Sequence, residues 1–176
     1  DIKSISKICQ RMDKLMLVDA VTSLGGSELQ TDSWHLDAVY SGTQKCLSCP
    51  PGLSPITLSD RSVRKLTNRK SKVQSWFLDL QLVMKYWDGQ VSRTYHHTAP
   101  VNLLYALHES LLMLHEEGLG PARRRHETLS KLLHDKLVAR GFRYLVPESE
   151  RIPHLHAIFP PPGLDEEKAR RRLLED

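Results

Sequence analysis

The sequence predicts an α/β fold, and three observations carry that prediction. Two short apolar runs, residues 15–18 and 38–40, end abruptly at polar or turn-forming residues, as the buried strands of an α/β sheet do. Helical spacing of apolar residues precedes and follows these runs. The 176 residues are 40% hydrophobic and 26% charged, which is ordinary for a globular domain, and no apolar run is long enough to span a bilayer.

The first half of the chain alternates helices and strands. Apolar residues recur with helical spacing from Ile2 to Met12, including Ile5 and Ile8, which predicts a short helix packed on the sheet. Ser59 and the acid after it are typical of a helix N-terminus. The remaining predicted elements are strands at 15–18, 37–40 and 53–58, helices at 61–66 and 75–87, and a polar loop at 90–98.

The second half is mainly helical. A strong helix is expected after Pro100, with Gly118 as its end, and a second one from Ala122 to Arg140. Short strands at 142–146 and 155–159 and a helix after Asp165 complete the pattern. We therefore expect residues 1–118 to form part of a large domain and residues 119–176 to begin a small α+β domain.

Two charged side chains follow the first two predicted strands. Asp19 ends the first apolar run, and Lys45 lies in the small-residue turn after the second. Ligands of α/β sheets bind beyond the carboxyl ends of the strands, so both side chains are candidates for one crevice. An acid and a lysine there suit pyridoxal 5′-phosphate (PLP): the amine forms a Schiff base with the aldehyde, and the acid pairs with the ring nitrogen. A turn-forming aspartate and a solvated loop lysine remain the alternative.

The surrounding residues favour the cofactor. The stretches 18–26, 40–45 and 50–52, with later matches at 76–79 and 95–98, resemble the class V aminotransferases of PLP fold type I. The resemblance covers nearly the whole chain in one order with few gaps. It implies part of the large PLP-binding domain of that fold, followed by the start of its small C-terminal domain.

The resemblance also implies roles for individual residues. Lys45 would hold the cofactor and move protons between the substrate α-carbon and the cofactor, and Asp19 would stay ionised against the pyridinium. Val21 would pack on one face of the ring, with a plain core valine as the alternative. Gln44 would contact the cofactor phosphate, with an ordinary loop amide as the alternative. The related cysteine desulfurases usually have histidine at this position, so Gln44 favours an aminotransferase.

Tyr95 and Thr98 lie further along the chain. In the family, the corresponding hydroxyls reach the phosphate of the neighbouring subunit, so the resemblance implies a homodimer. The adjacent His96 and His97 invite a metal interpretation, but neighbouring residues of an extended loop point apart, and we prefer a structural role. We expect no metal site.

The expected reaction moves an amino group from alanine or serine to glyoxylate or pyruvate. The alternatives are a truncated, non-catalytic PLP-binding chain or pseudoenzyme, and another class V enzyme such as a cysteine desulfurase. The family's phosphate-binding glycine loop and substrate-carboxylate arginine match no residue here. We therefore expect the chain to be an internal piece of a longer protein and to be inactive alone.

Net charge and cysteine content restrict which partners and which redox compartment the sequence predicts. A net charge of +4, with basic and acidic residues interleaved, argues against a nucleic-acid partner. Three cysteines give no disulfide framework and indicate a reducing compartment. The pair Cys46 and Cys49 has C-x-x-C spacing, but a single such pair is weak support for zinc or redox chemistry.

The resemblance also implies a location. Family members occupy peroxisomes and mitochondria, so a peroxisome is expected, with mitochondrion or cytosol as alternatives and glyoxylate detoxification as the biological role.

Overall fold

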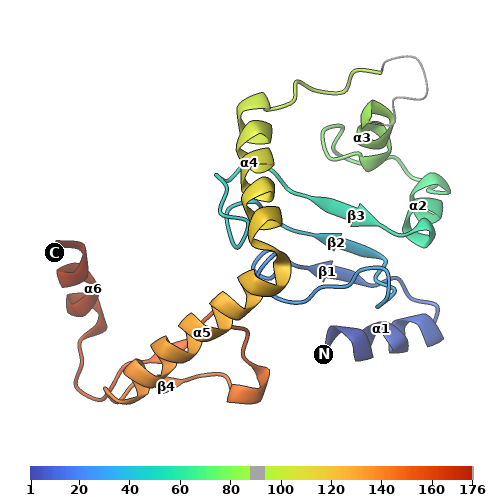
Figure 1. The fold of residues 1–176 in the computed structure, drawn as a ribbon. Helices are drawn as coiled ribbons and strands as arrows, with labels where there is room; N and C mark the ends of the chain where they lie inside the picture. Colours follow the sequence, from blue (N-terminus) through green and yellow to red (C-terminus); the bar gives the residue numbers. More distant parts are fainter. Residues whose placement is uncertain (88–93, 176) are drawn as a thin grey trace.

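A three-stranded sheet lies at the centre of the computed structural model, which describes residues 1–87 and 94–175. The strands β1 (Leu17–Asp19), β2 (Ala38–Tyr40) and β3 (Ile56–Leu58) lie side by side in that order (Figure 1). β1 and β2 are parallel, whereas β3 runs antiparallel to β2. The parallel arrangement therefore holds for the first two strands only. β3 begins three residues later than predicted, after Pro55, which has no amide hydrogen for a strand ladder.

The two faces of the sheet differ in burial. Val18 and Val39 point to one face and are about 5–6% exposed, and with Ala20 and Leu36 they form the core. Because side chains alternate along a strand, Leu17, Asp19 and Tyr40 belong to the other face. Leu17 is 66% exposed, so this second face is open at its β1 edge.

The helix α1 (Ile2–Arg11) forms where the sequence predicts it, but its packing differs from the prediction. Ile2 packs against the core, and the hydroxyl of the buried Ser6 donates a hydrogen bond to the Trp34 carbonyl at 2.5 Å. That bond turns the Ser6 side of the helix inward. The other apolar positions are consequently exposed: Ile5 (50%), Ile8 (46%) and Met12 (64%).

Two short helices follow β3. In α2 (Asp60–Thr67) Ser59 is the N-cap, and its hydroxyl accepts a hydrogen bond from the Ser62 amide, as predicted. α3 (Leu80–Trp87) begins later than the predicted residue 75, because the Asp79 carboxylate accepts the amide of Gln81 and so marks the helix start. The predicted loop 90–98 falls partly outside the described residues, and its part from 94 onward has no regular secondary structure.

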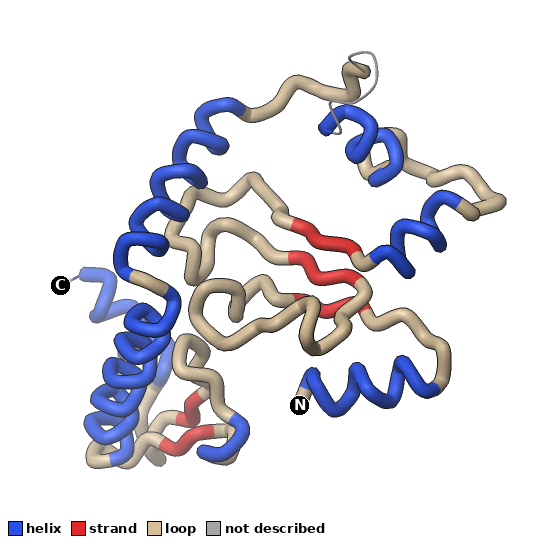
Figure 2. The backbone as a smooth tube through the Cα atoms, turned by 45° about the vertical axis from the view of Figure 1, so that its right-hand side comes forward, coloured by secondary structure: helices blue, strands red, loops and turns tan. Residues whose placement is uncertain are grey.

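Two long helices form a bent column beside the sheet (Figure 2). α4 (Val101–Glu117) and α5 (Leu119–Val138) are separated only by Gly118, whose φ of +80° suits glycine. The predicted break at Gly118 is confirmed, but α5 begins at Leu119 rather than Ala122. Pro121 is tolerated there because the first turn of a helix has no use for its amide hydrogen.

The C-terminal part is small and thinly packed. The strands β4 (Arg143–Tyr144) and β5 (Ile158–Phe159) pair antiparallel and are shorter than predicted. A 3-10 turn, η1 (Glu148–Glu150), lies between them, and α6 (Glu166–Glu175) follows. The division into domains at residues 118 and 119 stays a prediction. In the part of the chain that the structure describes, no helix is long and apolar enough to cross a membrane.

Candidate functional site

Asp19 is the last residue of β1 and is exposed. One of its carboxylate oxygens accepts a hydrogen bond from the Val21 amide, and the other accepts one from the Tyr40 hydroxyl, each at 2.8 Å. The Val21 amide and, next, the Tyr40 hydroxyl lower the pKa of Asp19 below its usual value. Asp19 therefore carries a negative charge at neutral pH, and the carboxylate is held by two donors.

The loops that follow β1 and β2 are tied to each other. The Ala20 amide donates to the Tyr40 carbonyl at 2.9 Å, and the buried Ser41 hydroxyl donates back to the Ala20 carbonyl at 3.0 Å. Further along, the Cys46 thiol donates to the Thr22 carbonyl, with 3.3 Å between sulfur and oxygen. The residue after Lys45 thus contacts a residue three positions after Asp19, so the structure brings the two loops together.

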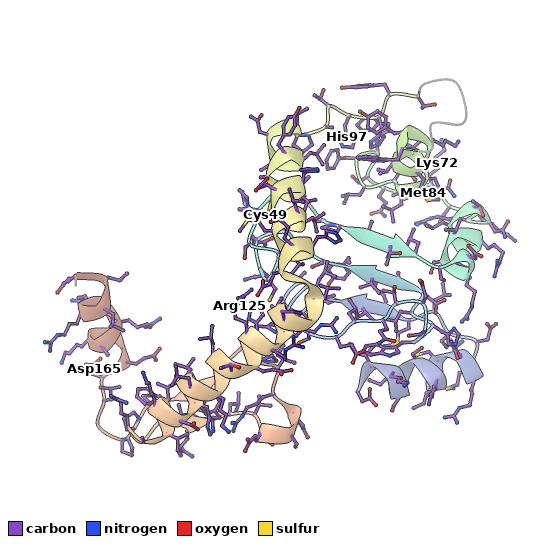
Figure 3. All side chains as sticks on the ribbon, viewed as in Figure 1. Cys49, Lys72, Met84, His97, Arg125 and Asp165 are labelled. Atoms are coloured by element: carbon purple, nitrogen blue, oxygen red, sulfur yellow. The ribbon has the colours of Figure 1, made fainter. Side chains whose placement is uncertain are left out.

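The backbone of the Lys45 loop is fixed from several sides. Thr43 is fully buried, and its hydroxyl donates to the Pro50 carbonyl at 2.8 Å. The Ser48 amide closes a turn on the Lys45 carbonyl at 2.9 Å, and Ser110 of α4 donates to the Leu47 carbonyl. Cys49 lies beside α4 (Figure 3), in agreement with the contact that Ser110 of that helix makes with this loop.

Lys45 itself is exposed on this fixed loop. Among the residues that the structure describes, its ammonium group has no hydrogen-bond or ion-pair partner. Gln44 is also exposed, and a Cβ placed on Gly42 would meet its side-chain oxygen at 2.6 Å, so the Gln44 side chain lies across Gly42. A rigid backbone with a free amine is a suitable base for covalent chemistry.

Val21 contributes its backbone amide to Asp19, and its side chain is half-buried. A packing role against a cofactor ring stays a prediction for that side chain. Two other residues that the structure places here, Tyr40 and Ser41, had no predicted role. The feature that could have identified them is their position at the end of β2, where Tyr40 pairs in register with Asp19 of the parallel strand β1.

Tyr95 and Thr98 lie on a loop anchored near α3. Their hydroxyl oxygens are 2.6 Å apart, and Tyr95 is 64% exposed. The buried His96 between them stacks on Trp76 with 4.1 Å between ring centroids and bonds to the Trp76 carbonyl. Among the described residues, these two hydroxyls bond to each other and not to Asp19 or Lys45. Their role across a subunit interface stays a prediction.

Metal coordination finds no support in the described residues, which contain no group of three histidine, cysteine, aspartate or glutamate side chains that could hold a metal ion. His96 and His97 bond to each other, with 2.7 Å between their Nδ1 atoms, in keeping with the structural role preferred for them. The cysteines Cys9, Cys46 and Cys49 are free thiols.

The structure thus has an ionised acid and an exposed lysine at the carboxyl edge of two parallel strands, which is where ligands of α/β sheets bind. Residues 1–167 match the model of the aminotransferase class-V family, and the chain belongs to this family. The match confirms the predicted family.

Two solved structures share the fold of this chain closely. The alanine–glyoxylate aminotransferase of Nostoc sp. has a TM-score of 0.94 and 41% identity, covering 99% of this chain and 46% of that one. The ureidoglycine–glyoxylate aminotransferase of Bacillus subtilis also has a TM-score of 0.94, with 36% identity, covering 100% and 45%. These neighbours confirm the predicted fold class, a partial α/β chain of PLP fold type I.

A curated relative agrees with the solved structures. The alanine–glyoxylate aminotransferase of Callithrix jacchus is 40% identical over 167 residues, which is 93% of this chain and 40% of that protein. The chain therefore spans less than half the length of the relatives it matches. A cysteine desulfurase of Thermococcus onnurineus, at 18% identity and a TM-score of 0.71, shares the fold alone.

Proposed function

We propose that the protein is a PLP-dependent aminotransferase that moves an amino group from alanine or serine to glyoxylate or pyruvate. One observation carries the proposal: the ionised Asp19 and the exposed Lys45 stand on two loops that hydrogen bonds tie together at the same edge of β1 and β2. Three of the four similar proteins reported above carry glyoxylate in their names, which supports this choice of acceptor.

The residues present fit PLP. Bound PLP supplies an aldehyde carbon for the amines and a protonated ring that withdraws electrons from the substrate. Asp19 is charged, and two donors occupy two of its four acceptor positions. The carboxylate can therefore still accept a hydrogen bond from the ring N–H. Lys45 has a free amine for the aldehyde. Gln44 beside it offers an amide N–H to the phosphate, and Val21 offers an apolar side chain to the ring.

Lys45 has two tasks in this proposal. Its Nζ would hold PLP through the aldehyde when no substrate is present. As an uncharged amine, Nζ would then move the proton between the substrate α-carbon and the cofactor. Asp19 keeps its charge throughout, because its two donors favour the ionised carboxylate.

The assembly and location are part of the proposal. We propose a homodimer in which the paired hydroxyls of Tyr95 and Thr98 bind the phosphate held by the other subunit. Hydroxyl donors suit a dianionic phosphate, and the exposure of Tyr95 leaves it accessible to a second copy. We place the protein in the peroxisome, with mitochondrion or cytosol as the alternatives, in glyoxylate detoxification.

Absorption spectroscopy tests the function. The protein expressed from its own gene, and the 176-residue chain as a second sample, are mixed with PLP and scanned for the visible absorbance of the lysine-bound cofactor. L-Alanine should remove this absorbance, and glyoxylate should restore it. Lys45→Ala should show no such absorbance, and borohydride reduction should label the Lys45 peptide of the wild type only. Lys7→Ala, on the exposed side of α1, is the matched control and should behave as the wild type.

The alternatives give different results. A cofactor absorbance that no amino acid removes would indicate a pseudoenzyme that only binds PLP. Sulfide released from cysteine would indicate a desulfurase. Absence of any lysine-bound cofactor in the protein expressed from its own gene would contradict the proposal as a whole.

A further inference from the structure

The hydroxyl of Tyr40 is the only side-chain donor that reaches Asp19 among the described residues. Tyr40 is the last residue of β2 and pairs in register with Asp19 of β1, so the two side chains stand next to each other on the same face of the sheet. The oxygen atoms are 2.8 Å apart, a distance that suits a hydrogen bond to a charged acceptor.

The two donors to Asp19 are not equivalent. The Val21 amide belongs to the turn that follows β1 and stays in place whatever the side chain at position 21 is. The Tyr40 hydroxyl comes from another strand, 21 residues later in the sequence. It holds the second oxygen, and with both oxygens held the carboxylate cannot rotate about its Cβ–Cγ bond without losing a hydrogen bond.

The position of Tyr40 is itself fixed. Its carbonyl accepts the Ala20 amide, and the next residue, Ser41, donates its hydroxyl to the Ala20 carbonyl. The bond to Asp19 raises the pKa of the Tyr40 phenol, so the hydroxyl keeps its proton at neutral pH and remains a donor. A donor on a fixed strand can therefore hold the acid in one orientation.

We propose that Tyr40 is a positioning residue of the cofactor site: its hydroxyl fixes the orientation in which the Asp19 carboxylate would meet the ring nitrogen of PLP. This inference rests on the proposed function, and it adds a residue to which the sequence assigned no role. The Asp19 oxygens retain acceptor capacity after binding both donors, so Tyr40 does not compete with the ring N–H.

Tyr40→Phe removes the hydroxyl and keeps the ring. In the cofactor-free full protein, the carboxyl pKa of Asp19, followed by carbon NMR, should rise relative to the wild type. PLP affinity, followed by absorbance, should fall about tenfold at neutral pH, the size expected for one hydrogen bond to a charged group. The loss of affinity on acidification should begin at a higher pH than in the wild type. Tyr105→Phe, an exposed tyrosine of α4, is the matched control and should change none of these quantities.

A double-mutant cycle separates this role from a general structural one. In the Asp19→Asn background, Tyr40→Phe should cost much less PLP affinity than it does in the wild type, because the charge it supports is gone. The phenol of Tyr40 gives a second measurement that does not depend on the folding of Tyr40→Phe. Its pKa, followed by ultraviolet absorbance, should fall in Asp19→Asn, which retains Tyr40.

The outcomes separate the two proposals. A wild type that binds no PLP overturns the proposed function and this inference together. A wild type that binds PLP at Lys45, with Tyr40→Phe unchanged in affinity and in its pH dependence, overturns the inference alone. Equal effects of Tyr40→Phe in the wild-type and Asp19→Asn backgrounds also overturn it, and so does an unchanged phenol pKa.

Discussion

The carboxyl edge of β1 and β2 and the C-terminal part of the chain (β4 to α6) differ in how far their polar groups are paired. At the sheet edge, Asp19 has two donors and Ser41 has an acceptor, above a core that includes Val18 and Val39. In the C-terminal part, several buried polar atoms have no hydrogen-bond partner among the described residues: the Tyr144 hydroxyl, both ring nitrogens of His154 and Nδ1 of His156.

The apolar residues show the same contrast. Leu36 beneath the sheet is 5% exposed, whereas Leu145 after β4 is 60% exposed. The ring of Tyr144 is covered by the Arg151 guanidinium, 4.1 Å from its centroid, but its hydroxyl is unpaired among the residues described. Contacts within this chain therefore determine the candidate site, whereas they determine the C-terminal part only loosely.

The largest expected difference between the regions is in stability. Leu36→Ala removes a buried side chain from the core under the site and should cost about 2–5 kcal/mol in the free energy of unfolding. Leu145→Ala removes an exposed side chain and should stay within about 0.5 kcal/mol of the wild type. Urea unfolding measures both. Similar costs for the two variants would remove the contrast on which this comparison depends.

Asp19→Asn tests the charge at the sheet edge. The amide keeps the shape of the side chain and loses the negative charge that would stabilise the protonated cofactor ring. The rate at which L-alanine removes the cofactor absorbance should fall about 10²–10³-fold, the usual cost of deleting one electrostatic stabiliser. Asp32→Asn, on an exposed turn, is the control and should react at the wild-type rate. An unchanged rate in Asp19→Asn would exclude a charge role for this carboxylate.

Ser41→Ala tests the tie between the two loops. Ser41 is 3% exposed, and its loss would leave the Ala20 carbonyl without that donor, so the variant should lose about 1–3 kcal/mol of stability. PLP affinity should fall as well, because fewer hydrogen bonds would hold together the loops that carry Asp19 and Lys45. Ser54→Ala, at an exposed position, should change neither quantity. A fully stable Ser41→Ala with normal affinity would show that the remaining backbone bonds suffice.

Local signals explain which features the sequence predicts well. Ser59 caps α2, and Gly118 separates two helices, because each effect involves only neighbouring residues. The position of Asp19 and Lys45 at one edge was also predictable, since parallel strands share the edge where their carboxyl ends lie. The features that depend on distant residues were not: the antiparallel direction of β3 and the packing of α1 on its Ser6 side.

The Tyr40 contact shows why part of the site escaped prediction. The sequence places Tyr40 at the end of a strand, but whether it meets Asp19 depends on register, and a shift of one residue would turn it to the opposite face. The roles expected of Tyr95 and Thr98 cannot be derived from local sequence signals, because they would involve the phosphate held by a second copy of the chain.

The smallest expected effect is in the C-terminal part and concerns pH. Burial, and then the neighbouring His126 and His156, lower the pKa of His154 in the folded protein. The unfolded chain therefore binds a proton at His154 more readily, and stability present above about pH 6.5 should be lost as the pH falls through the lower folded pKa. His154→Gln should flatten this part of the urea-unfolding profile, whereas His115→Gln, on the exposed surface of α4, should leave it unchanged. An equally steep profile in His154→Gln would show that His154 does not contribute to the acid sensitivity of the protein.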